Sequence, residues 1–543
     1  METTWDTLRN ELAGAGASRP ASGKGRGPLP LVLGVACDPG DPAAPDSGRL
    51  ERVCSVLEFL LAAYPATPAC LLFPPGPGPA DVAAGICARF GAQPLPFPDG
   101  LTAAPGAKDG VAVVLADDFS SVRQLADLVL FLPRDGGSLA CAQVDELPPY
   151  AGGDPAGQAG CALDINNAIN PPTACLCRDS PWPVFTPPEF DREEEQGTLL
   201  PVIFSNLEMF NRDALRALDR RAAEVAGSRG QLALPAPDDP GALGPVRDFF
   251  ALFDALSLRA QRCIKNTRLA TISLAVPSIL FMQLYSLDRQ PAWALGYSAC
   301  IAGGLSVFAL SRRLRWHAKY HDYRSLAELL RIQAYWAVAG VAQRAGDHFP
   351  LNGDCEILWI RKAAQRITAR LAVPRPDPGE AGLSFAVQAW VKDQERYFNG
   401  SGKDTPGSTR KAFRMQKRLS AWTAGVFFLG IFLLVLQFTL PFLFPGVGRI
   451  GEMGVLSSLL LAVAAGLETY SKLSLFSENA KRYRRSGRNF QVCRGILEGL
   501  LKKKAHGEAR DTLFSLGRES LFENSYWLML CRQIGRASCR ERV

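Results

Sequence analysis

The chain has 543 residues, of which 47% are hydrophobic and 21% charged, and its formal net charge is +7. This charge is modest for the length and its basic residues gather beside long apolar runs, which disfavours direct nucleic-acid binding. Fourteen scattered cysteines without a CxxC motif and only four histidines disfavour a metal site and suit a reducing compartment.

Residues 1–27 lack an apolar signal core, so we expect a flexible segment and no secretory signal. Residues 28–226 read as buried-strand runs that alternate with amphipathic helices. This alternation predicts an α/β domain with a parallel, Rossmann-like sheet. The predicted strands are 31–36, 69–73, 93–97, 126–132 and 183–186, and the predicted helices are 49–64 and 79–90.

Ligands of parallel sheets bind beyond the carboxyl ends of the strands. The candidate ligand-binding residues are Gly34, inside the first strand, and, on this rim, Asp38, Gly40, Asp135, Gly136 and Gly137. No GxGxxG or GxxxxGK[ST] motif is present in the sequence, so no cofactor is predicted. Two interpretations stay open: a working ligand pocket, and a degenerate domain that only docks partners.

A Pro- and Asp-rich linker is expected over 227–245, followed by a first membrane domain over 246–398. Two charge-free runs within it predict membrane-spanning helices at about 269–287 and 291–311. Because only Asp288 and Arg289 separate them, we expect a tight hairpin.

A second linker is expected over 399–409, and a second membrane domain over 410–533. Its apolar runs predict spans at about 420–444 and 453–470. The charge-free run of the last span ends at Glu468, an intramembrane acid that could line a pore, pair with a lysine or extend to the interface.

The basic residues form four clusters, one at the end of each predicted span that lies away from the hairpin tip. Positively charged residues stay on the cytoplasmic side of a membrane. All four clusters lie on one side only if all four runs cross, so we expect two hairpins with both termini cytoplasmic. In a bacterium this is a multi-pass protein of the inner membrane, whose first partner is the lipid bilayer.

Helical cytoplasmic elements are expected around the spans, because apolar residues recur there at 3/4 spacing. Three helices are predicted between the hairpins, around 326–336, 357–371 and 385–398. The fourth span is predicted to continue past Leu473 as one helix, whose apolar seam packs either on this chain or on a second copy. Similar basic stretches, Ala318–Arg324 and Ala480–Arg485, follow the two hairpins and hint at a duplicated unit.

One helical motif has a specific resemblance. The segment His317–Trp336 contains Tyr320, His321, Asp322, Tyr323 and Arg324. It resembles bacterial proteins that join a SLOG-like Rossmann domain to SMODS/SLOG-associated two-transmembrane effector units. Further matching pieces are Leu358–Ala363, Trp390–Phe398, Phe476–Arg485 and Leu516–Leu530. In the N-terminal domain the family's Thr-Gly-His-Arg-like turn is replaced by Ala36–Gly40, without the His and Arg.

The resemblance implies a sensor and effector of bacterial conflict, or anti-phage, systems. The Rossmann-like domain would sense a nucleotide-type ligand or a partner. The hairpins, in a single chain or in a homo-oligomer, would perturb the membrane. The alternatives are a membrane-tethered nucleotide-processing enzyme and a non-catalytic membrane scaffold. No nucleophile–base pair, metal cluster or phosphate loop is recognisable, so no catalytic residue is proposed. His321 and Asp322 are adjacent, but neighbours on a helix point apart.

The last ten residues, Ile534–Val543, resemble the translation of a short-read sequencing adapter. We exclude them from the functional argument.

Overall fold

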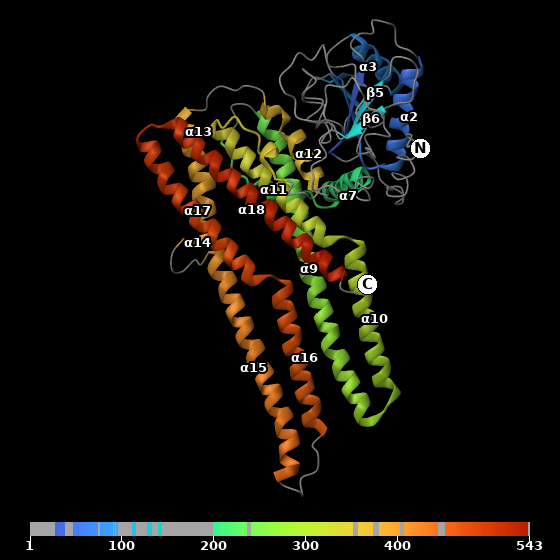
Figure 1. The fold of residues 1–543 in the computed structure, drawn as a ribbon, viewed down its shortest axis with the longest axis vertical. Helices are drawn as coiled ribbons and strands as arrows, with labels where there is room; N and C mark the ends of the chain where they lie inside the picture. Colours follow the sequence, from blue (N-terminus) through green and yellow to red (C-terminus); the bar gives the residue numbers. More distant parts are fainter. Residues whose placement is uncertain are drawn as a thin grey trace, which may run out of the picture.

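A computed structural model describes residues 28–37, 47–73, 77–90, 92, 94–95, 111–115, 128–132, 140–143, 199–235, 240–350, 357–372, 379–401, 407–443 and 451–540. It is mostly helical. A sheet lies at one end of a helical body, and two helical hairpins extend from the other (Figure 1).

The sheet is built from buried apolar runs, as the sequence predicts. Its described strands lie in the order β3-β4-β2-β1-β5-β6, and only the β5–β6 pair is antiparallel. The strands are β1 (Leu31–Cys37), β2 (Ala69–Phe73), β3 (Pro94–Leu95), β4 (Val111–Leu115), β5 (Leu128–Leu132) and β6 (Ala140–Gln143), and the helices beside them are α2 (Ser47–Ala63) and α3 (Pro77–Phe90).

Most of the predicted strands are confirmed, but two strands were missed. Strands β4 and β6 are absent from the prediction, although Val111–Leu115 is β-branched and apolar. The predicted strand at 183–186 lies outside the described residues. The predicted linker at 227–245 is wrong at both ends, because α8 (Ala222–Arg229) runs into it and α9 (Pro240–Asp288) begins inside it.

The membrane region is confirmed as four long apolar helices. Among the described residues, four helical stretches are long and apolar enough to cross a membrane. Helix α9 pairs with α10 (Pro291–Arg313), and α15 (Ser408–Leu443) pairs with α16 (Gly451–Leu473). Helix α16 also packs against α9, which joins the hairpins. Large apolar side chains such as Trp422, Phe428 and Leu305 are exposed on them, as lipid-facing residues are.

The prediction that span four continues as one helix is wrong. Helix α16 ends at Leu473, and α17 (Phe476–Lys502) begins after Leu475, a non-glycine residue with φ 49°. The break leaves the Ser474 carbonyl outside the helical ladder, and Asn479 Nδ2 donates a hydrogen bond to it at 3.3 Å. The apolar seam then packs within this chain, because the Phe490 ring stacks on Phe398.

Both hairpins share one design. In the first hairpin, α10 is followed by Arg315, which has a left-handed backbone conformation, and then by α11 (Trp316–Ala339). The same order recurs 160 residues later: α16, then left-handed Leu475, then α17. Helix α11 packs along α9, and α17 packs along α15. These repeated boundaries support an internal duplication of a hairpin-plus-helix unit.

The remaining helices complete the helical body. The third helix predicted between the hairpins is interrupted by a π turn at Val387–Val391. The other described helices are α7 (Leu199–Arg220), α12 (Leu358–Ile367), α13 (Gly379–Ala386), α14 (Lys392–Asn399) and α18 (His506–Arg540), with short 3-10 turns at Ala345–His348 and Ala369–Ala372.

Candidate functional site

The predicted ligand rim falls at the carboxyl ends of two neighbouring strands. Cys37, the last residue of β1, is the register partner of Leu132, the last residue of β5. Gly34 lies within β1, between Leu72 and Val129 of the flanking strands. The other predicted residues follow these strand ends along the chain but lie outside the described residues: Asp38, Gly40, Asp135, Gly136 and Gly137.

The opposite, amino end of the sheet is attached to helix α7. The side chain of Asn211 pairs with the backbone of Leu29: Leu29 N donates to Oδ1 at 3.0 Å, and Nδ2 donates to the Leu29 carbonyl at 2.7 Å. Glu208 accepts from Ala66 N at 3.1 Å and from Thr67 Oγ1 at 2.7 Å. Because both side chains are buried, these hydrogen bonds dock the sheet on α7 specifically.

A second attachment comes from helix α12. Arg366 is only 2% exposed, and its Nη1 donates to the Pro30 carbonyl, just before β1, at 3.0 Å. The Cys70 thiol near Arg366 is fully buried. Burial raises the pKa of this thiol to about 12, although the Arg366 guanidinium opposes that rise. Burial, and then the Glu208 carboxylate, also raise the pKa of the nearby Tyr64 hydroxyl.

The helical motif at the start of α11 connects different elements. Tyr323 donates its hydroxyl to Asp213 Oδ2 of α7 at 3.0 Å, and Lys319 Nζ lies 2.6 Å from the same carboxylate. On the first span's helix, Gln261 Nε2 donates to the Tyr320 hydroxyl at 3.3 Å. The motif therefore joins the helix under the sheet to the helix that enters the membrane.

His321 and Asp322 point to different neighbours, as expected of adjacent helical residues. The His321 ring lies against the His317 ring, with centroids 4.7 Å apart. Asp322 accepts a hydrogen bond from Arg532 Nη2 of α18 at 2.7 Å. The two side chains are thus used in contacts between and along helices and do not form a general-base pair.

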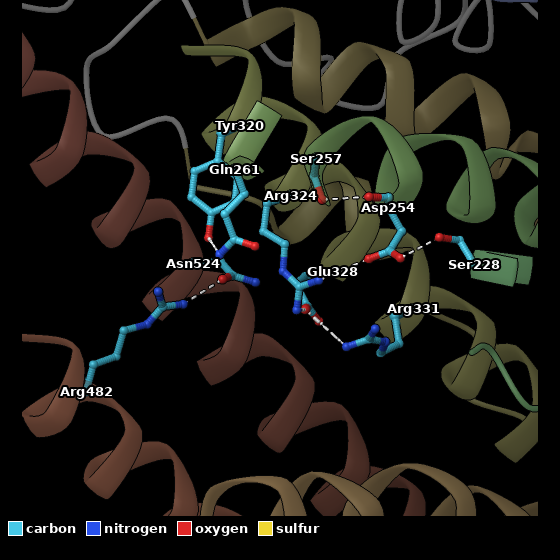
Figure 2. A network of polar contacts seen from close by, with 10 residues as sticks. All are labelled: Ser228, Asp254, Ser257, Gln261, Tyr320, Arg324, Glu328, Arg331, Arg482 and Asn524. Carbon is cyan, nitrogen blue, oxygen red and sulfur yellow. Dashed lines mark hydrogen bonds and ion pairs between the residues drawn. The ribbon is translucent and has the colours of Figure 1, made fainter. Parts of the chain in front are cut away.

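Arg324, the last residue of the motif, is at the centre of a polar network (Figure 2). Its Nη1 donates to Asp254 Oδ1 of α9 at 3.1 Å, and it also pairs with Glu328. Asp254 is 1% exposed and accepts a second hydrogen bond from Ser228 Oγ of α8 at 2.8 Å. Near this network, Arg482 of α17 donates to Asn524 of α18 at 2.8 Å. Helix α18 packs against α11, so the two hairpin units meet here.

Glu468, predicted as an intramembrane acid, lies near the end of α16 that precedes α17. Its carboxylate is 3.4 Å from Lys472 Nζ, one turn further along the helix, and its side chain is 49% exposed. Of the three expectations, the structure therefore places it with a lysine at the helix surface.

The sequence reasoning missed the attachment residues Glu208, Asn211 and Arg366. Each lies on an amphipathic helix, where a single polar residue on the buried face gives no distinctive spacing signal. Among the described residues, no group of three His, Cys, Asp or Glu side chains could hold a metal ion. No protein-family model, curated protein or solved structure matches the chain.

Proposed function

We propose that this protein is a membrane-anchored sensor and effector of the kind that the resemblance of residues 250–533 implies. In this proposal a cytoplasmic, Rossmann-like domain senses a nucleotide-type ligand or a partner. Its signal rearranges the two hairpins, which perturb the bacterial inner membrane. In this proposal both termini are cytoplasmic, and the chain forms a homo-oligomer.

The strand order supports a ligand site at the predicted rim. Along the chain, β2 and β4 are added on one side of β1, and β5 is added on the other. Doubly wound sheets bind ligands where the order reverses in this way, outside the carboxyl ends of the two central strands. In this sheet that point is at Cys37 and Leu132, directly before the predicted rim residues.

The observation that carries the proposal is the attachment of the amino end of β1. Leu29 and Pro30, which precede this strand, are held by Asn211 and Arg366. Their helices, α7 and α12, both contact α9, which continues into the membrane. A ligand at the far end of β1 can shift the hairpins only if it favours one packing of these helices over another.

A direct test uses the full chain reconstituted in liposomes with an entrapped fluorescent dye. A panel of mono-, di- and cyclic nucleotides is added, and dye release is compared with protein-free liposomes. We expect at least one nucleotide to trigger release, and the variant Asp135→Asn to weaken its effect. Release that no nucleotide alters contradicts the sensor, and nucleotide turnover without release supports the tethered enzyme instead.

The orientation is tested separately with membrane-impermeant maleimide on intact cells. A cysteine placed at Arg289, in the tip of the first hairpin, is expected to be labelled from outside. A cysteine placed at Arg220, at the end of α7, is expected to be labelled only after lysis. The reverse pattern contradicts cytoplasmic termini.

A further inference from the structure

The start of α15 carries a one-sided basic surface. Five exposed residues precede the third span, and we call them the basic stripe: Arg410, Lys411, Arg414, Lys417 and Arg418. Successive helical residues are rotated by about 100°, so these five side chains fall within about 120° of the helix circumference. The less exposed Thr409, Ala412 and Gln416 lie on the other side of the helix.

The protein does not neutralise this stripe within its described residues. Some basic residues near the other spans have acidic partners, such as Arg262 with Glu224, Lys319 with Asp213, and Arg482 with Glu523. No such ion pair is found for any of the five stripe residues in the part of the chain that the structure describes. The start of α15 thus carries five neighbouring cations on one side of the helix without an acidic partner among the described residues.

The position of the stripe matches the lipid headgroup layer. It ends at Arg418, where the charge-free run of the third span begins. Trp422, one turn further, is 69% exposed, and tryptophan is enriched at the membrane interface. From Arg410 to Arg418 the helix rises about 12 Å, and long basic side chains can bend toward a headgroup layer about 5–7 Å thick.

We infer that the basic stripe binds the phosphate groups of anionic phospholipids. Topology requires only that basic residues stay cytoplasmic; it does not require them to form one outward stripe without protein partners. An arginine guanidinium can donate two parallel hydrogen bonds to phosphate oxygens. Each cation near an anionic membrane surface contributes about 1 kcal/mol to the free energy of binding. The anionic headgroup is therefore the occupant that the charge and the position both favour.

The test uses the full chain in uncharged detergent micelles. Phosphatidylglycerol and phosphatidylcholine, each with the same acyl-chain fluorophore, are titrated, and energy transfer from tryptophan gives an apparent Kd. We expect preference for phosphatidylglycerol. The variant R410Q/R414Q/K417Q is expected to bind this lipid more weakly, by about fivefold for each cation removed, with phosphatidylcholine unaffected.

The matched control is K502Q/K503Q/K504Q, which removes three exposed charges at the end of α17 away from the hairpins (Figure 1). It is expected to bind phosphatidylglycerol as the wild type does, and the charge-preserving variant R410K/R414K is expected to keep the preference. Equal losses in both triple variants, or no preference in the wild type, overturn the inference. Tighter binding of poly-glutamate than of phosphatidylglycerol, lost in the stripe variant, assigns the stripe to an acidic protein and also overturns it.

Discussion

Arg532 donates a hydrogen bond from Nη2 to Asp322 Oδ1 at 2.7 Å, and the two side chains are 9% and 0% exposed. This buried ion pair joins α18 to the helix that follows the first hairpin. Between these two residues the chain passes through the whole second hairpin unit. The pair therefore joins the end of the second hairpin unit to the first unit and holds the two units together.

Asp322→Ala is expected to destabilise the protein by about 3–5 kcal/mol, because it leaves the Arg532 charge buried without its carboxylate partner. Arg532→Met is expected to cost a similar amount for the same reason. The double variant Asp322→Ala/Arg532→Met is expected to recover much of the loss, since both charges are gone. Thermal unfolding of all four proteins in one detergent measures this cycle. Additive losses in the double variant contradict a coupled pair.

Gly517 of α18 leaves room for the Trp336 indole of α11. A Cβ at Gly517 would overlap that indole, whose Nε1 donates to the Leu513 carbonyl at 3.2 Å. Gly517→Ala is therefore expected to lower stability by about 1–3 kcal/mol. In contrast, Gly495→Ala on α17 meets no atom within 4 Å and should be neutral or stabilising by up to about 1 kcal/mol. Equal thermal unfolding of the two variants contradicts the close contact.

Local sequence patterns were sufficient for the membrane region. Charge-free runs of about 20 residues can satisfy their backbone only as helices in lipid, so 269–287 and 291–311 fall inside α9 and α10. The break at Leu475 could not be predicted in this way. It lies between two good helix-forming segments, contains neither glycine nor proline, and depends on a hydrogen bond from Asn479.

The candidate site was less predictable because its contacts are distant in sequence. The alternation of strand and helix predicts a ligand site beyond the carboxyl ends of the strands. It contains no signal that pairs Arg366 with Pro30 or Asp322 with Arg532. Each of these contacts joins residues more than 200 positions apart. The helical motif was found through its resemblance and through the similar basic stretches after the two hairpins. Its role as a junction became visible only from its partners Asp213, Gln261 and Arg532.

The reactivity of Cys531, next to Arg532, measures whether the end of α18 is packed against the helical body. Its thiol is buried, and burial raises its pKa to about 12, although Arg482 and Arg268 oppose the rise. Because the thiolate is the reactive form, Cys531 is expected to be alkylated very slowly in the native protein. Site-resolved mass spectrometry after brief exposure to N-ethylmaleimide measures this. Asp322→Ala should speed the reaction at Cys531 and leave Cys70 in the sheet unchanged; fast native alkylation of Cys531 contradicts a seated α18.

The attachment of the sheet to α7 is tested by hydrogen exchange. The Leu29 and Ala66 amides donate to the buried side chains of Asn211 and Glu208. Removing either acceptor leaves a buried donor unsatisfied, which costs about 1–3 kcal/mol. Asn211→Ala and Glu208→Ala are therefore expected to speed exchange at these amides by about tenfold or more. Arg220→Ala, on the same helix but at a side chain that is 77% exposed, provides the control and should change neither rate.

The same exchange experiment separates local loosening from loss of the domain. If α7 only anchors the amino ends of β1 and β2, exchange accelerates at Leu29 and Ala66, while the centre of β1, at Leu33 between Leu71 and Leu128, stays protected by both neighbouring strands. Equal acceleration at Leu33 would mean that α7 is part of the folding unit of the sheet. In that case β1 could not carry a signal as a rigid strand from the rim to the helical body, and the proposed route to the hairpins would fail.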